Sequence, residues 1–210
     1  MQFDLHVHSK YSYDCKSEPN LILKVAKTKG LAGIAITDHN NVKFHISASS
    51  YETDIIVIPG IEVSTKRGHI LGLGIKENIP TGLEVIETIE LIKDLGGVAV
   101  IAHPFDFLRH GIGKVVYKLP KTPIETHNGA TLFSFMNRKA ERWANKMSWP
   151  KVGGSDAHRL KDIGLAFTEI NEEIETGEEL LELIEKGKTS GNGSHLSPFQ
   201  KLIRTFQIHL

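Results

Sequence analysis

Short, almost wholly apolar runs recur along this chain, and several are followed by a side chain that can bind a metal ion. Residues 31–37 (LAGIAIT) lead into Asp38, and residues 98–102 (VAVIA) lead into His103. A strand that is apolar on both faces is typical of a parallel sheet with helices on either side. The pattern therefore restricts the fold to the α/β class.

Segments with helical character separate these strand-like runs. Residues 81–95 place apolar side chains at helical spacing, and residues 17–29 open with a capping Ser and an early Pro before a Gly. Strands joined through helices run parallel with right-handed crossovers, and about seven of them suit a closed or distorted β/α barrel. We expect strands at 2–7, 31–37, 54–61, 68–74, 98–102, 124–126 and 164–169, and helices at 17–29, 81–95, 133–147 and 176–186.

Neither an internal repeat nor a linker divides the chain. We predict one domain over residues 1–210, with residues 190–210 as a C-terminal tail docked on the barrel. The formal net charge of zero argues against a protein held to nucleic acid mainly by charge, although a short single-stranded end could be gripped in a local site. One cysteine, no signal-like N-terminus and no long apolar run predict a cytoplasmic protein without a membrane partner.

Histidine is enriched, with 11 in 210 residues, and many of the histidines end strand-like runs. In β/α barrels the C-terminal ends of the strands meet at one mouth, where the chemistry occurs. His6 and His8 also share one face of the first expected strand, because strand side chains alternate with a period of two. Two imidazoles on one face can chelate a single ion, so the sequence predicts a metal site at the barrel mouth.

Five short motifs then occur in a fixed order over the first 170 residues. They are His6-Val7-His8-Ser9, Ile36-Thr37-Asp38-His39, Gly60-Ile61-Glu62-Val63-Ser64 with Gly68-His69, Ala102-His103-Pro104, and Gly154-Ser155-Asp156-Ala157-His158. Together they resemble the PHP family, the polymerase and histidinol phosphatase domain. The resemblance implies a distorted (β/α)7 TIM-like barrel that holds two or three divalent metal ions.

The resemblance also assigns ligands by position, and no motif position is lost. The first ion would take His6, His8, Glu62 and Asp156; the second would share Glu62 and add His69 and His103; the third would take Asp14, His39 and His158. Mixed imidazole and carboxylate ligands suit Zn, Mn or Fe, whereas Mg prefers oxygen alone. His69 is the ligand whose position relative to Glu62 the sequence fixes least.

This ligand chemistry favours phosphoester hydrolysis. A bridging carboxylate such as Glu62 can hold two ions about 3.5–4 Å apart, which suits attack by a metal-activated hydroxide on phosphorus. A phosphorylated small molecule, a nucleotide or a short single-stranded nucleic-acid end would be the substrate.

Histidinol phosphate is the alternative substrate. Alternatives of other classes are a non-catalytic scaffold barrel in RNA processing and an amidohydrolase. Residues 75–95 have room for only one helix, so the sizeable insertion of nucleotide-acting relatives is missing here, which argues against nucleotide substrates and predicts a more open pocket.

Further side chains are expected around the metals. Besides Glu62 and Asp156, we expect catalytic contributions from Asp38, which either orients a ligand or caps a turn, and from Arg159. Arg159, which follows the last ligand, is our first choice for binding phosphate. Lys10, Arg67 and Arg109 are alternatives, His127 is expected to contact substrate, Glu125 and Asn128 are expected to support the rim, and Cys15 is interpreted as structural.

Overall fold

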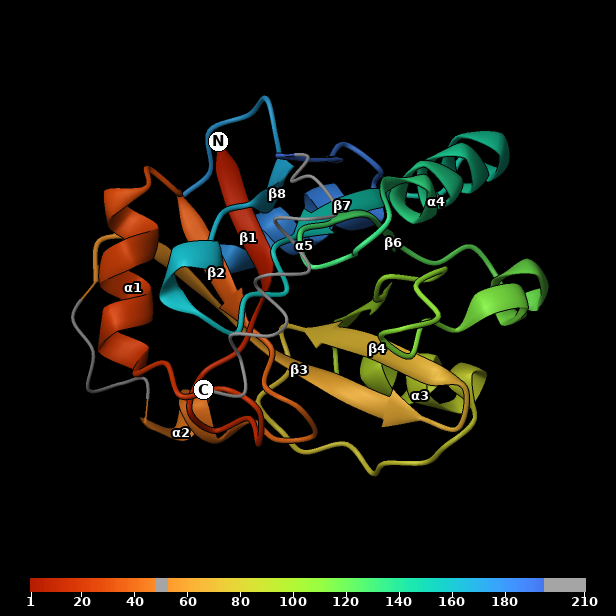
Figure 1. Ribbon diagram of the computed structural model, residues 1–210, viewed down its shortest axis with the longest axis horizontal. Coiled ribbons are helices and arrows are strands. Elements are labelled where there is room, and N and C mark those ends of the chain that lie inside the picture. Colours follow the sequence, from red (N-terminus) through yellow and green to blue (C-terminus); the bar gives the residue numbers. More distant parts are fainter. Residues whose placement is uncertain (48–52, 195–210) are drawn as a thin grey trace.

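The computed structural model describes residues 1–47 and 53–194, and within them strands and helices alternate along most of the chain (Figure 1). The strands are β1 (Gln2–Val7), β2 (Gly33–Ile36), β3 (Ile56–Thr65), β4 (Gly68–Leu73), β5 (Val98–Ile101), β6 (Ile124–Asn128), β7 (Lys151–Gly154), β8 (Ala166–Glu169) and β9 (Ser190–Gly193). The helices are α1 (Pro19–Thr28), α2 (Lys43–Ser47), α3 (Val85–Asp94), α4 (Ser134–Met147) and α5 (Gly177–Glu185), with 3₁₀ turns η2 (Gly113–Lys118) and η3 (Leu160–Asp162).

The strands form one sheet in the order β7-β6-β5-β4-β3-β2-β1-β8-β9, which curls until its ends approach. The seam lies between β1 and the segment after β7. There the backbone N–H of Asp156 donates to the carbonyl of His6 at 2.7 Å, and that of His8 donates to the carbonyl of Ala157 at 3.0 Å. The predicted distorted α/β barrel is therefore confirmed.

The direction of two strands differs from the sequence prediction. β4 runs antiparallel to both β3 and β5, and β8 runs antiparallel to β1. β9, which was not predicted as a strand, pairs antiparallel with β8. Only Lys66 and Arg67 join β3 to β4, and two residues can close a hairpin but cannot carry a crossover helix. As a result His69, near the start of β4, lies opposite Ser64 near the end of β3. Glu62 lies inside β3 and not at its end.

The apolar core holds the helices against the outer face of this barrel. The buried side of α1, with Ile22 and Ala26, packs with Ile34 and Ile36 of β2. On the far side of the molecule, α3 and α4 cover β4, β5 and β6 through a second cluster that includes Ile89, Ile101 and Ala140 (Figure 1). This packing fixes the strands whose side chains enter the barrel mouth. β9 carries the first residues of the predicted docked tail; residues 195–210 lie outside the described part of the chain.

Close backbone approach at the seam depends on Gly154. A Cβ atom on this residue would lie 2.4 Å from the Cβ and 2.8 Å from the backbone N of His6, closer than real atoms come. Asp4 strengthens the same seam, since its carboxylate accepts the backbone N–H groups of Ser155 at 2.8 Å and Gly164 at 2.7 Å. Burial raises the pKa of Asp4 to about 6.

Replacing Gly154 with alanine should therefore open the seam. We expect the free energy of unfolding, measured with urea in chelator, to fall by about 1–3 kcal/mol or more, as for overpacked cores. Gly177→Ala is the matched control, because its added methyl would meet only side-chain atoms, Ile58 Cγ1 at 3.3 Å and Ile56 Cγ2 at 3.8 Å. Equal stability of the two variants would contradict this account of the seam.

Candidate metal centre

The structure brings together all nine side chains that the sequence singled out as ligands. Their nitrogen and oxygen atoms form four overlapping groups, within each of which the atoms lie no more than 4.8 Å apart. The groups are His6-Glu62-His103, His6-His8-Asp156, His39-Glu62-His69, and His8-Asp14-His39-His158. The third predicted set, Asp14, His39 and His158, lies within one of these groups together with His8. The first and second predicted sets are each divided between two groups, which share His6 for the first set and Glu62 for the second.

Glu62 occupies the middle of the cluster. Its carboxylate is 1% exposed and is surrounded by imidazole nitrogens. These are His69 Nδ1 at 2.8 Å, His39 Nδ1 at 3.0 Å, His103 Nε2 at 3.2 Å, His8 Nε2 at 3.4 Å and His6 Nε2 at 3.5 Å. Burial alone would raise the pKa of Glu62, but these rings hold it well below its ordinary value. The carboxylate is therefore ionised and available to bridge two cations.

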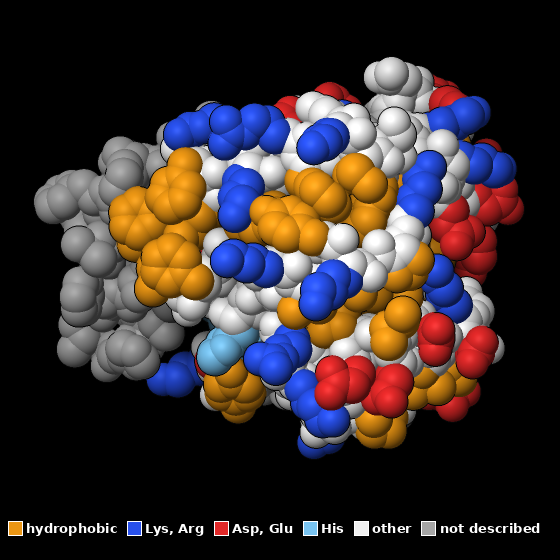
Figure 2. Space-filling view, turned by 90° about the vertical axis from the view of Figure 1, so that its right-hand side faces the viewer, with side chains coloured by type: hydrophobic (Ala, Val, Ile, Leu, Met, Phe, Trp, Pro, Cys, Tyr) orange, Lys and Arg blue, Asp and Glu red, His pale blue; other side chains and the backbone are white. Residues whose placement is uncertain are grey.

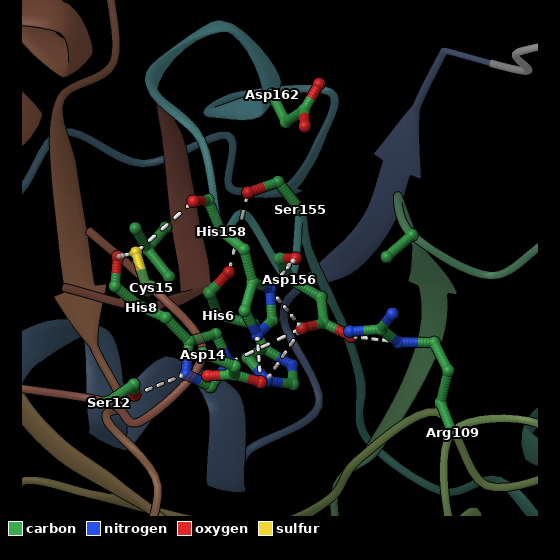
Figure 3. Close-up of polar contacts among 12 residues, drawn as sticks. His6, His8, Ser12, Asp14, Cys15, Arg109, Ser155, Asp156, His158 and Asp162 are labelled. Carbon is green, nitrogen blue, oxygen red and sulfur yellow. Dashed lines mark hydrogen bonds and ion pairs between the residues drawn. The ribbon is translucent and has the colours of Figure 1, made fainter. Parts of the chain in front are cut away.

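Asp156 supplies the second buried carboxylate. It lies 3.4 Å from His8 Nε2 and 3.6 Å from His6 Nε2, and its other oxygen accepts a 2.9 Å hydrogen bond from Arg109 Nε. Figure 3 shows Arg109 reaching Asp156 from the side opposite to Asp14. Burial opposes ionisation of Asp156, but Arg109 and the histidines lower its pKa well below the usual range. The positive φ of 53° at Asp156 turns the chain sharply at the end of β7.

Asp14 makes the third carboxylate corner, from the loop after β1. Its Oδ2 lies 3.1 Å from His158 Nε2 and 3.3 Å from His39 Nε2. Unlike the other two carboxylates it is partly exposed, at 29%. Cys15 beside it is buried, and its thiol contacts the carbonyls of His8 and His158 at 3.2 and 3.3 Å. These contacts agree with the structural interpretation of Cys15.

The imidazoles differ sharply in proton affinity. Burial disfavours the charged form of His39, yet the adjacent carboxylates of Asp14 and Glu62 raise its pKa to about 10. Burial likewise opposes charge on His6, but Asp156, Glu62 and Glu125 raise its pKa well above the ordinary value. Burial and the neighbouring His158 instead lower the pKa of His8 to about 3. In the absence of a cation, protons on His6 and His39 balance the carboxylates.

Several buried polar atoms of this cluster have no hydrogen-bond partner in the described structure. Among the residues that the structure describes, ten buried side-chain N or O atoms make no hydrogen bond, and seven of the ten belong to the cluster. These seven are His6 Nε2, His8 Nε2, Asp14 Oδ1, His39 Nδ1, Glu62 Oε2, His69 Nδ1 and His103 Nδ1. Leaving such atoms unsatisfied is costly, and imidazole with carboxylate is a ligand set for divalent metals. The residues therefore fit divalent metal binding.

Polar residues that surround the cluster hold its histidines in place. Glu125 of β6 is fully buried; its Oε1 lies 3.1 Å from His6 Nδ1, and its Oε2 accepts the backbone N–H of His103 at 2.7 Å. Asn128 donates to Glu125 at 2.9 Å and is itself held by Asn137 of α4, which donates to its carbonyl at 3.0 Å. Glu125 was expected only to support the rim, yet it contacts the ring of a predicted ligand.

Asp38 reaches the histidines through Ser12. Its carboxylate accepts hydrogen bonds from the backbone N–H and hydroxyl of Ser9 at 2.7 and 2.6 Å and from the Ser12 hydroxyl at 2.8 Å. The Ser12 hydroxyl lies 3.0 Å from His8 Nδ1. Asp38 thus caps the turn after β1 and orients a ring at the same time, so the two expected roles coincide. Ser12 was not predicted to contribute to the site. The one feature of the sequence that could have pointed to it is its position two residues before the predicted ligand Asp14.

The expected substrate-binding residues lie elsewhere. The guanidinium of Arg159 turns away to pair with Asp162 at 2.8 Å, and Lys10 pairs with Glu18 at 2.8 Å. His127 lines a separate cavity with Arg138 and Asn192, because β6 shifts register between Glu125 and His127. None of the three side chains lines the cavity that leads to the metal cluster in the described part of the chain.

Arg109 occupies the position expected of Arg159. An open cavity of about 160 Å³ leads to the cluster, and Arg109, Tyr13, Leu108 and His110 line it beside the predicted ligands. Tyr13, which the sequence did not single out, is 85% exposed and stacks on His39 with ring centroids 5.0 Å apart. Arg67 is exposed on the β3–β4 turn. Arg109 was one of four cations considered, and nothing in its local sequence distinguished it.

A barrel with this cluster at its mouth fits a class of α/β proteins that bind divalent metal ions. The family model described as the PHP domain matches residues 4–141, and one described as PHP-associated matches residues 135–189. The chain belongs to the PHP domain family. The resemblance inferred from the five motifs is thereby confirmed.

Individual relatives agree with this assignment. The uncharacterised protein MJ1587 of Methanocaldococcus jannaschii is 39% identical over 140 residues, which is 61% of this chain and 82% of that protein. Among solved structures, a two-domain protein from Bacteroides vulgatus containing a predicted PHP-like metal-dependent phosphoesterase matches with a TM-score of 0.77 at 18% identity, over 97% of this chain and 69% of that one.

A further structural match is a lesion-specific endonuclease from Pyrococcus furiosus. Its TM-score is 0.65 at 20% identity, and the match covers 92% of this chain and 59% of that one. At such identities the two structural matches show a common fold alone. Within residues 1–47 and 53–194, no helix is both long and apolar enough to traverse a bilayer.

Removing the charge of Glu125 should weaken metal binding. We expect Glu125→Gln to lower the affinity for the tightest ion by about 10- to 100-fold, measured by isothermal titration calorimetry, because an anion no longer orients His6. Glu141→Gln, on the exposed side of α4, is the control and should bind as the wild type. Unchanged affinity in Glu125→Gln would show that the contact is incidental.

Metal loading should also release protons. With a pKa of about 10, His39 is protonated at pH 7.5 and must lose its proton before it can bind a cation. Apparent affinity should therefore rise as the pH increases from 6 towards 9. Calorimetry in buffers of different ionisation enthalpy should show at least one proton released per chain, and about one fewer in His39→Gln. A pH-independent affinity without proton release would refute this assignment.

Proposed function

We propose that this protein hydrolyses phosphate esters with two or three divalent ions, either Zn, Mn or Fe, held at the barrel mouth. The observation that supports this most directly is the nine-residue cluster itself. Seven of its buried polar atoms make no hydrogen bond to any described residue, and Arg109 lines the cavity beside it. His6, His8, Glu62 and Asp156 would hold the first ion, and Glu62 would bridge to a second held by His69 and His103. Asp14, His39 and His158 would hold the third.

Ions bound there would supply the Lewis acidity that activates water and neutralises charge on the phosphoryl group. The chain's own side chains do the rest. Glu125 and Ser12 fix the rings of His6 and His8, and fixed ligands need no reorganisation during the reaction. Asp14 is the exposed corner of the cluster, so its ligand set is the one most open to an incoming substrate.

Arg109 is our choice for the group that binds substrate phosphate, in place of Arg159. Its side chain is 32% exposed and lines the cavity, while among the described residues only its Nε–H is engaged, with Asp156. A guanidinium carries five N–H donors in a planar fork that matches phosphate oxygens. Asp156 would thus hold both a metal ion and the cation that recognises the substrate.

The openness of the cavity and one structural neighbour support a choice of substrate class. A cavity of about 160 Å³ that is open to solvent accepts the phosphorylated end of a larger molecule better than it encloses a whole small one. A protein of the same fold is named as a lesion-specific endonuclease. We therefore favour a nucleotide or oligonucleotide phosphoester over a smaller phosphorylated metabolite.

Metal-loaded protein should hydrolyse p-nitrophenyl phosphate or its bis-ester, and chelation should abolish the reaction. Glu62→Gln removes the bridging charge, so we expect both the metal content by mass spectrometry and kcat to fall, the latter by at least about 100-fold. Glu141→Gln again serves as the control. Fewer than one bound ion per chain, with neither ester hydrolysed, would overturn the proposed function.

Arg109 variants in the same assay separate recognition from metal binding. Arg109→Ala should keep most of the metal but lose activity, and Arg109→Lys should restore part of it because the positive charge returns without the fork.

A further inference from the structure

Beyond the cavity, one face of the molecule is strongly basic although the chain as a whole is neutral. Residues 107–151 contain nine Lys and Arg but two acidic residues, one of which is the buried Glu125. Residues 169–185 contain eight Glu and no basic residue. Figure 2 shows the resulting face: Lys and Arg side chains spread between hydrophobic ones, with Asp and Glu gathered towards one side. The zero net charge therefore hides a local cationic surface.

Aromatic rings stand between these cations. The ring of Tyr117 on η2 packs edge-on against Trp143 on α4 with centroids 4.6 Å apart, and Lys139 Nζ lies 4.2 Å from the centroid of Phe105. These contacts join η2 and α4 into one continuous surface. Phe107, Phe135 and Tyr117 are 70%, 49% and 44% exposed. We call the surface formed by residues 105–121 and 133–146 the η2–α4 face.

This face runs directly into the metal centre. Leu108 and Arg109, which line the cavity, belong to the same loop as Phe105 and Phe107 and follow the predicted ligand His103. At the other end of the face, Asn137 in the first half of α4 holds Asn128, which hydrogen-bonds to Asp156 at 3.3 Å. A chain of phosphates lying on the face would therefore reach the cluster at Arg109.

We propose that the η2–α4 face binds the single-stranded part of a nucleic acid whose reacting phosphoester enters the metal centre, an inference that rests on the proposed function. Single strands are bound by basic grooves whose aromatic side chains stack on bases, since every base has a π-face. This face presents both kinds of side chain, since Lys118, Arg142 and Lys146 are exposed on it as well as the rings. A membrane-binding surface would instead collect its apolar residues on one side and its cations on the other.

Charge reversal on this face should weaken binding of oligonucleotides and spare small esters. The triple variant K118E/R142E/K146E should raise the KM for 5′-phosphorylated dT12 or rU12 at least about tenfold at 100 mM salt. It should also make the slope of log Kd against log salt shallower by roughly 2, since each lost phosphate contact contributes about 0.7. The matched control K24E/K27E/K161E, on α1 and η3, should behave as the wild type. Activity on p-nitrophenyl phosphate should not change in either variant.

A second variant tests the rings independently of charge. F107A/F135A removes two exposed side chains, so the fold is expected to survive, and Kd for labelled dT12 by fluorescence anisotropy should rise at least about fivefold. Equal KM values for dT2 and dT12 in the wild type would overturn the proposal, as would equal losses in the test and control triple variants. Tighter binding of anionic phosphatidylglycerol vesicles than of dT12 would also overturn it. Absence of p-nitrophenyl phosphate hydrolysis would instead count against the proposed function, and the binding data would still decide on the face.

Discussion

The structure depends on one buried carboxylate, that of Glu62, with five imidazoles within 3.5 Å of its oxygens. An anion in the interior is tolerated only when opposite charge offsets its desolvation. Here the rings come from β1, β4 and the ends of β2 and β5, so the requirement to neutralise one group draws four strands to a single point. The curl of the sheet and its closure at the seam put those strands within reach.

Without cations, protons on His6 and His39 neutralise this centre, and seven buried polar atoms stay without hydrogen bonds. Divalent ions bound by these atoms would satisfy them. Because ligands that bind only the folded state stabilise it, such binding would raise the stability of the fold. The surrounding residues Glu125, Asn128 and Ser12 orient the imidazoles of His6 and His8 beforehand. They therefore limit the rearrangement that metal binding would need.

Much of this could be predicted from the sequence, and for a physical reason. Strand-like runs that are apolar on both faces predict the fold class. The side chains that follow these runs indicate which residues meet at the barrel mouth. The antiparallel course of β4 was missed because periodicity carries no direction, although the two-residue link between Thr65 and Gly68 contained that information. Arg159 was preferred to Arg109 because it adjoins a ligand. The direction of a long side chain depends on its partners, and the guanidinium of Arg159 pairs with Asp162.

The β3–β4 hairpin has a consequence for how the centre assembles. Glu62 and His69 lie on the two arms of one tight hairpin, so they meet after a very short loop closes. His8 and Asp156, by contrast, come together only when nearly the whole chain has been brought round to the seam. Loop closure costs more entropy for distant residues, and non-local contacts form late in folding. The centre thus combines one pair that is local in the sequence, Glu62 and His69, with another that forms only when the barrel closes, His8 and Asp156. A metal ion bound between His8 and Asp156 would therefore report that the barrel has closed.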